Sequence, residues 1–304
     1  MASKPYAALL KGLAVHPLVG PDDTLEEARE KLEAVHGHAI GEGTRVEWVE
    51  LGGVRCAWVD TPETREAPRT LVLCHGGAYV AACGDGYLFY AEMLARPCAA
   101  RLLLVDYRLA PAHRHPAALE DCASAYRGLL DEGHAPGRIG FVGDSCGGTL
   151  AITSLLHLRD QGVPMPALAA TLGGWFDLEA GGESATHPVG PDPFAHPEFT
   201  RARGRDYVGP GGDLRDPLVS PIHADPTGLP PLFLQAGQVD LTRDDAVRLA
   251  KSAGRAGVDV TLEIVPEMIH GFQGLASAGI PEAVAALDRL GAFVRSRIPD
   301  PEPS

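Results

Sequence analysis

The 304-residue sequence predicts a protein of the α/β class, with a mostly parallel sheet that has helices on both faces. Two observations lead to this prediction. Short apolar segments of strand length alternate with longer segments of helical periodicity between residues 70 and 297, and this alternation is typical of parallel βαβ units. Hydrophobic residues make up 45% of the chain, which is enough to fill a sizeable core.

The first 60 residues precede this alternation. Pro21-Asp22-Asp23-Thr24 is typical of a helix start and predicts a helix over 25–35. The alternating segments 46–51 and 54–59 flank Gly52-Gly53, so they predict a β-hairpin that forms an antiparallel edge of the sheet. We expect residues 1–42 to be the N-terminal segment of a helical cap.

The alternation then runs almost to the end of the chain. Strands are predicted near 70–74, 102–106, 139–143, 168–172, 231–236 and 260–265, and helices near 85–96, 116–131, 147–160, 243–256 and 281–297. Residues 177–219 interrupt it with a stretch rich in Gly, Pro, His and charge that has one helical part near 197–207. Such long interruptions are often functional lids, so we expect a second cap segment there. The main domain is then 43–298, and 299–304 is a disordered tail.

The pentapeptide Gly143-Asp144-Ser145-Cys146-Gly147 lies between a predicted strand and a predicted helix. It fits the G-x-S-x-G nucleophile elbow, which places a serine hydroxyl on a sharp and exposed turn. A Gly-rich turn that contains a serine by chance is the alternative. The strand–turn–helix context favours Ser145 as a nucleophile.

A second motif follows the strand near 70–74, where the chain reads His75-Gly76-Gly77. Acyl transfer requires backbone N–H donors that are already in place for the oxyanion of the tetrahedral intermediate. Glycines let the backbone approach that oxygen closely. The predicted oxyanion-hole donors are the amides of Gly76, Gly77 and Cys146.

Two further polar residues follow the last two predicted strands. Asp240 follows the strand near 231–236, and His270 follows the strand near 260–265. Ligands of α/β folds bind at these carboxyl ends. The order Ser…Asp…His is that of the α/β hydrolases. We therefore predict a catalytic triad in which His270 is the base for Ser145 and Asp240 orients the imidazole.

These motifs together resemble the hormone-sensitive-lipase-like family of α/β-hydrolases, which includes many bacterial carboxylesterases. The resemblance rests on matching residues in the same order: His75-Gly76-Gly77, Asp106-Tyr107-Arg108-Leu109-Ala110-Pro111, Pro116-Ala117-Ala118-Leu119-Glu120-Asp121, Gly143-Asp144-Ser145 with Gly147-Gly148, Ser220-Pro221, Asp240 and His270-Gly271-Phe272. It implies an eight-stranded α/β-hydrolase domain with a mostly helical cap. It also implies hydrolysis of short- to medium-chain esters without a metal or organic cofactor, by the triad and oxyanion hole named above.

The sequence departs from the family pattern at three positions near these motifs. Ala78 stands where a third glycine is usual, and Cys146 stands where an alanine usually follows the nucleophile. Leu241 stands where a proline usually follows the acid. All three catalytic side chains are present, so we expect the departures to affect substrate range more than chemistry.

The sequence therefore favours a serine carboxylesterase that works through an acyl-enzyme. An amide hydrolase, such as an N-deacetylase of a small metabolite, would use the same triad and stays open as an alternative. A non-hydrolytic ligand-binding protein is a third possibility, because fold does not fix function. The expected partner is a small ester or amide, and the resemblance also makes a homodimer plausible.

Composition excludes several other classes. The net charge of −14, from 26 basic and 40 acidic residues, argues against a nucleic-acid or anionic-membrane partner. No stretch approaches the ~20 apolar residues of a membrane span, and we expect no signal peptide at the N-terminus. None of the six cysteines has the C-x-x-C spacing of a zinc or redox site. We expect reduced thiols in a cytoplasmic protein.

Overall fold

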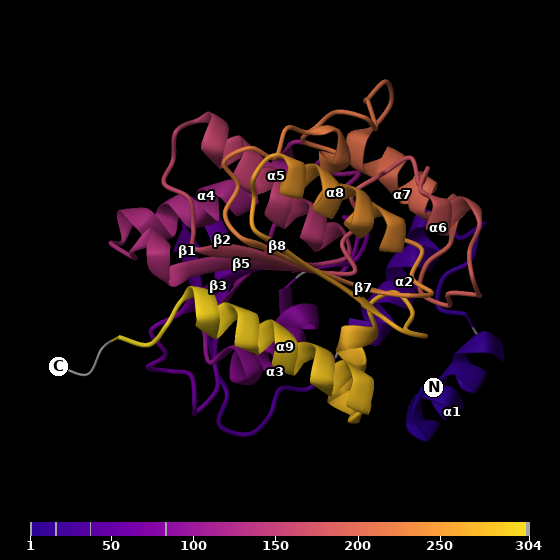
Figure 1. The fold of residues 1–304 in the computed structure, drawn as a ribbon, viewed down its shortest axis with the longest axis horizontal. Coiled ribbons are helices and arrows are strands. Elements are labelled where there is room, and N and C mark those ends of the chain that lie inside the picture. The colour runs from indigo at the N-terminus through magenta and orange to yellow at the C-terminus, as the bar shows by residue number, and fades with distance from the viewer. Residues whose placement is uncertain (1, 16, 37, 83, 302–304) are drawn as a thin grey trace.

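The computed structural model describes residues 2–15, 17–36, 38–82 and 84–301, and in it a twisted sheet lies between two layers of helices (Figure 1). The sheet has eight strands in the order β1-β2-β4-β3-β5-β6-β7-β8. All neighbours are parallel except around β2, which is antiparallel to both β1 and β4. The predicted mostly parallel eight-stranded sheet is confirmed. The strands are β1 (Arg45–Leu51), β2 (Val54–Asp60), β3 (Thr70–Cys74), β4 (Arg101–Val105), β5 (Ile139–Asp144), β6 (Leu168–Leu172), β7 (Leu232–Gly237) and β8 (Val260–Val265).

Helices cover both faces of this sheet, as the sequence predicts. Figure 1 shows α3 (Leu88–Cys98) and α9 (Pro281–Arg297) below the sheet, and α4 (Ala117–Asp131), α5 (Cys146–Asp160) and α8 (Arg243–Arg255) above it. Because of this double cover, β3, β5, β6 and β7 bury every residue. This is why they appear in the sequence as continuous apolar runs rather than as alternating patterns. By contrast, β8 lies at one edge of the sheet and its residues are only partly buried or exposed. The homodimer expected from the resemblance stays a prediction.

The strand register places the carboxyl-terminal ends of several strands next to one another, along the same end of the sheet. Cys74 at the end of β3 pairs with Gly143 of β5, and Gly237 at the end of β7 pairs with Val265 of β8. The loops that leave these strands therefore start side by side. All of the predicted site residues lie on those loops or directly after β5.

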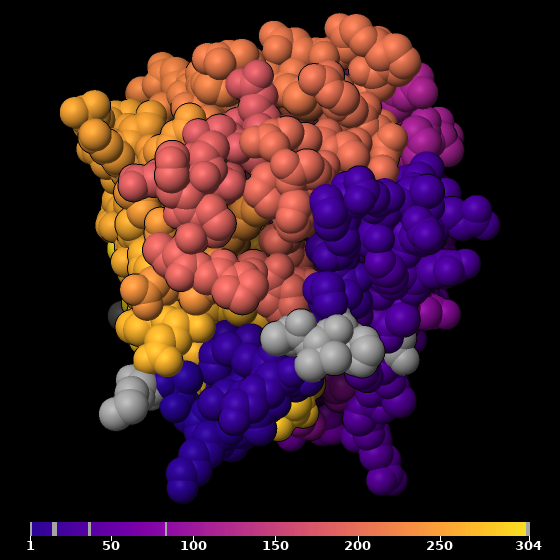
Figure 2. All heavy atoms as spheres, turned by 90° about the vertical axis from the view of Figure 1, so that its right-hand side faces the viewer, coloured from indigo at the N-terminus to yellow at the C-terminus, as the bar shows by residue number. Residues whose placement is uncertain are grey.

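The remaining α-helices lie at that end of the molecule (Figure 1). They are α1 (Lys4–Val15), α2 (Leu25–His36), α6 (Glu183–Thr186) and α7 (Pro197–Val208). Figure 2 shows the N-terminal segment in indigo lying against the salmon-coloured 177–219 segment. Hydrogen bonds join the two, because Leu18 N–H donates to the Pro193 carbonyl at 2.8 Å and Arg203 Nη1 donates to the Thr24 carbonyl at 3.3 Å. The predicted boundaries of the cap at 1–42 and about 177–219 stay predictions.

Three other expectations concern the chain ends and the cysteines. Within the described residues, no helix combines the length and the apolar character needed to cross a membrane. Asp300, in the predicted tail, forms an ion pair with Arg69 at 2.7 Å, and residues 302–304 lie outside the described residues. Cys83 also lies outside them. The five described cysteines are buried and free: Cys56, Cys74, Cys98, Cys122 and Cys146.

The β1–β2 hairpin turns through two glycines that carry different constraints. Gly52 and Gly53 have φ of 57° and 78°, as a two-residue hairpin turn requires. A Cβ on Gly52 would overlap the backbone carbonyl of Ser124 in α4, whereas a Cβ on Gly53 would meet nothing within 4 Å. The hairpin therefore packs closely on α4 because residue 52 has no side chain, as Gly128 on the facing side of α4 also has none.

We expect the two alanine substitutions in this turn to differ. Gly53→Ala incurs only the left-handed backbone cost and should lower the free energy of unfolding by about 1 kcal/mol. Gly52→Ala incurs the same cost plus the overlap with Ser124, and should lose about 1–3 kcal/mol more. Urea unfolding of both variants measures the difference, and equal losses would contradict this account of the packing.

Candidate active site

Ser145 occupies a strained turn between β5 and α5. Its φ of 52° and ψ of −124° lie outside the regions that non-glycine residues prefer. The flanking glycines make the turn possible, because a Cβ on Gly147 would overlap the Cys74 carbonyl and a Cβ on Gly143 would overlap the Gly147 carbonyl. The predicted strand–turn–helix elbow is thus present, with the Ser145 hydroxyl at its apex.

His270 and Asp240 meet Ser145 across this edge of the sheet. His270, in the loop after β8, has its Nε2 2.9 Å from Ser145 Oγ and its Nδ1 2.9 Å from Asp240 Oδ1. Asp240, which follows β7, is 1% exposed. Its Oδ1 also accepts the backbone N–H of Thr242 at 2.8 Å and the Thr242 hydroxyl at 2.9 Å. The structure therefore brings together all three predicted side chains and adds Thr242, two residues after the acid.

Burial and neighbouring groups shift the pKa values of His270 and Asp240 in opposite directions. Burial favours the neutral imidazole of His270, but the adjacent carboxylate of Asp240 outweighs it and raises the pKa of His270 to about 9. Burial would also raise the pKa of Asp240, yet His270 and Thr242 hold that pKa below its ordinary value. Asp240 is therefore an ionised carboxylate at neutral pH, and it stabilises a positive charge on His270.

The loop after β3 carries the predicted oxyanion donors. Gly76 N–H donates to Asp144 Oδ1 at 3.0 Å, so this amide already has an acceptor in the protein. The other oxygen of Asp144 accepts the Tyr87 hydroxyl at 2.7 Å. Burial raises the pKa of Asp144 to about 6. Within the described part of the chain, the amides of Gly77 and Cys146 have no hydrogen-bond acceptor.

One departure from the family pattern, Ala78, lies in the same loop, and a second, Cys146 at the start of α5, contacts it. Gly77, Ala78 and Tyr79 have φ of 101°, 53° and 66°, so Ala78 and Tyr79 adopt a left-handed conformation that favours glycine. The Cys146 thiol accepts the Tyr79 N–H at 3.2 Å. Burial raises the pKa of Cys146 to about 12, so the thiol stays protonated. Cys146 thus holds a strained loop at the position where the resemblance leads us to expect alanine.

A cavity of about 280 Å³ opens beside Ser145 and His270. Helix α2, the oxyanion loop and the start of α3 contribute apolar walls, and Phe194 and Phe199 close it from the 177–219 segment. A much smaller chamber of about 30 Å³ lies on another side of Ser145, between Trp175, Phe194 and Thr242. Other aromatic residues near the site, Tyr79, Phe176, Tyr207 and Phe272, belong to the packed interior.

Besides Thr242, sequence reasoning misses a second polar residue of the site, Asp192. Asp192, in the 177–219 segment, accepts the backbone N–H of His270 on Oδ2 at 2.7 Å and the N–H of Phe194 on Oδ1 at 3.0 Å. Burial and the charge of Asp240 raise the pKa of Asp192 to about 7. Nothing in the Gly/Pro-rich sequence around residue 192 indicates contact with a loop 78 residues away.

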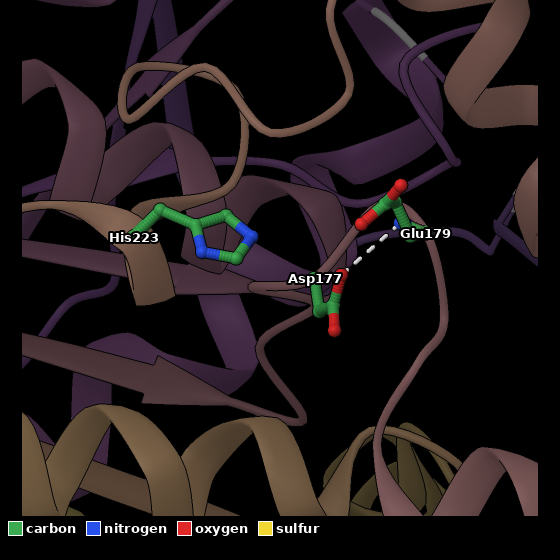
Figure 3. Close-up of side chains that lie close together, drawn as sticks. All are labelled: Asp177, Glu179 and His223. Carbon is green, nitrogen blue, oxygen red and sulfur yellow. Dashed lines mark hydrogen bonds between the residues drawn. The ribbon is translucent and has the colours of Figure 1, made fainter.

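A separate group of metal-ligand side chains lies where the 177–219 segment leaves and rejoins the domain. Figure 3 shows Asp177, Glu179 and His223, whose ligand atoms lie within 4.8 Å of one another. Both carboxylates already pair with arginine, Asp177 with Arg248 at 2.6 Å and Glu179 with Arg215 at 3.2 Å. Glu179 thus joins the start of the segment to its end, and Asp177 joins the start of the segment to α8.

Comparisons with known proteins bear on this geometry. Residues 71–274 match the protein family described as alpha/beta hydrolase fold. The chain is 38% identical to an acetyl-hydrolase of Streptomyces hygroscopicus over 248 residues, which are 82% of each chain. It is 31% identical to an esterase of Acinetobacter venetianus over 251 residues, again 82% of each.

Solved structures resemble the chain over nearly its whole length. An esterase from the bacterial hormone-sensitive lipase family superposes with a TM-score of 0.91 at 35% identity, covering 98% of this chain and 100% of that one. The esterase EstE5, from crystals soaked with p-nitrophenyl butyrate, gives a TM-score of 0.92 at 34% identity with the same coverage. The family match and these structural superpositions both agree with the resemblance seen in the sequence.

The charge on His270 can be measured directly. We expect its imidazole to titrate near pH 9 in NMR spectra of the folded protein, because ionised Asp240 favours the protonated ring. Asp240→Asn removes that charge, so the pKa should fall by roughly 1–3 units. The protonated form would then be lost at lower pH than in the unaltered protein. An unchanged titration in the variant would contradict the assigned pairing.

Proposed function

Because the chain belongs to the alpha/beta hydrolase family and is a carboxylesterase of its hormone-sensitive lipase type, we propose that it cleaves small esters of short to medium acyl chain through Ser145, His270 and Asp240. One observation above all supports the assignment of these residues. A continuous hydrogen-bonded path runs from the hydroxyl at the strained elbow through the imidazole to a buried carboxylate. It lies at the wall of an apolar cavity.

Each group has a defined role in the proposed reaction. Ser145 Oγ attacks the ester carbonyl while its proton passes to Nε2 of the neutral form of His270, and Asp240 stabilises the imidazolium that forms. His270 then donates this proton to the departing alkoxide, which leaves as an alcohol. The acyl group remains on Ser145 until a water molecule, deprotonated by His270, releases it as a carboxylic acid.

The oxyanion of each tetrahedral intermediate needs donors that are already in place. We assign this role to the amides of Gly77 and Cys146, which have no protein acceptor in the described part of the chain. The sequence also predicts Gly76 as a donor. Its amide donates to Asp144, so we propose that Gly76 contributes to the oxyanion only if that bond shifts during the reaction.

The two chambers beside Ser145 support a limit on substrate size. The chamber of about 30 Å³ holds only a very small group, and the cavity of about 280 Å³ holds one larger apolar group. An ester with one short side fits both chambers without movement of the walls. The p-nitrophenyl butyrate used with EstE5 is an ester of this type.

Replacing the nucleophile tests the proposed role of Ser145. We expect Ser145→Ala to lower kcat for p-nitrophenyl butyrate at least about 10³-fold, because no other side chain takes over the attack. The variant should keep its circular dichroism spectrum and should lose labelling by a fluorophosphonate probe. Retained turnover by a purified and folded variant would refute the assignment.

Substrate length gives an independent test. Along the series p-nitrophenyl acetate, butyrate, octanoate and decanoate, we expect kcat/KM to fall at least about 10-fold from butyrate to decanoate, because the chambers do not hold the longer chain. Phe194 lines both chambers, so Phe194→Ala should move the preference toward longer chains. The corresponding anilides measure amide cleavage. Equal kcat/KM along the series would contradict the size limit.

A further inference from the structure

Asp192 connects the 177–219 segment to the loop that carries His270. Both of its carboxylate oxygens accept backbone N–H groups, one from His270 at 2.7 Å and one from Phe194 at 3.0 Å. The first bond fixes the main chain of the proposed base. The second fixes an aromatic residue that lines both chambers beside Ser145. One side chain thus sets the position of the base and of a substrate-binding wall together.

The loop around Asp192 is itself held by the N-terminal segment. The Pro193 carbonyl accepts the amides of Leu18 and Val19, at 2.8 and 3.4 Å. The N-terminal segment also holds the loop that carries His270. The hydroxyl of Tyr6 in α1 accepts the N–H of Ile269 at 3.2 Å and donates to the Glu267 carbonyl at 3.1 Å. The loop of His270 is therefore held at two successive amides, one by α1 and one by Asp192.

Charge adds a second effect to this geometry. Three acidic groups from different parts of the chain contribute to the potential at His270, namely Asp240 at Nδ1, Asp192 at the backbone and Asp144 at the end of β5. An ionised Asp192 favours the imidazolium form. The pKa of Asp192 is raised to about 7 and that of His270 to about 9, so between these values both groups are charged. The other titratable groups near Asp192 are Tyr6 and, in an apolar cavity of about 580 Å³ that Asp192 also lines, His196 and Glu267.

We propose that Asp192 is a positioning residue for His270, through which the cap segment fixes the catalytic base and the Phe194 wall in one arrangement. The proposal rests on the hydrolase function assigned above. Asp192 lines neither chamber beside Ser145, and it acts through the backbone bond and through its negative charge.

Two variants separate these two actions. Asp192→Asn keeps an oxygen acceptor for the His270 N–H but removes the charge, so kcat should stay within about threefold of the unaltered enzyme. The acidic limb of the pH profile of kcat/KM should then move to lower pH by roughly 1 unit, because the imidazolium of His270 is no longer stabilised by a negative charge on residue 192. Asp192→Ala also removes the backbone bond, and kcat should fall up to about 100-fold through misplacement of the base.

Asp213→Asn is the matched control. Asp213 lies in the same cap segment and accepts the N–H of Arg215, two residues later, at 2.8 Å, much as Asp192 accepts that of Phe194. It is exposed, so the substitution should leave both kcat and the pH profile unchanged. A shift in this control equal to that of Asp192→Asn would assign the effect to net charge and overturn the proposal.

Two other outcomes would also overturn it. One is a pH profile of Asp192→Asn that superimposes on that of the unaltered enzyme, and the other is an Asp192→Ala variant with unchanged kcat. NMR titration of His270 in the Asn variant gives the same pKa shift without any substrate. A loss of the hydrolase assignment, seen as turnover by Ser145→Ala, is therefore distinguishable from a failure of the role of Asp192.

Discussion

The buried carboxylate of Asp240 is the constraint on which the rest of the site depends. A carboxylate that leaves water must find compensating partners, or it takes up a proton instead. Asp240 finds them in the His270 ring and in the amide and hydroxyl of Thr242. The bond from Asp240 to Nδ1 fixes the imidazole of His270 in one orientation, and Nε2 of the ring then faces Ser145. The electrostatic requirement of one side chain thus determines the geometry of the other two.

The sheet topology makes this arrangement possible. Ser145, Asp240 and His270 are far apart in sequence, yet each follows a strand whose carboxyl end lies at the same edge. The sequence is sufficient to predict this much. Buried parallel strands appear as apolar runs, elbow glycines mark the turn, and the polar residues after β7 and β8 can be assigned by chain order alone. The predicted strands and helices accordingly agree with the structure to within a few residues.

What the sequence does not predict lies where irregular segments meet. The contact of Asp192 with His270 joins two loops that have no periodicity, and no local pattern indicates which amide a carboxylate will bind. The same holds for Gly76, whose amide turns toward Asp144 because Tyr87 and the end of β5 hold that carboxyl group beside it. Motifs identify residue types for a reaction. The hydrogen bonds that each amide makes depend on long-range packing that a motif does not encode.

The division of the enclosing wall between two distant stretches of chain has a consequence for biosynthesis. Helix α2 has only 12 residues, a length at which a helix in water is marginal without packing partners. Its neighbours include the Val80 and Ala110 carbonyls, which Arg29 binds, and the segment before it is held by the Pro193 carbonyl. All of these partners follow α2 in the chain, so they leave the ribosome after it. The wall that α2 contributes beside Ser145 can therefore complete its packing only after residue 193 has been synthesised.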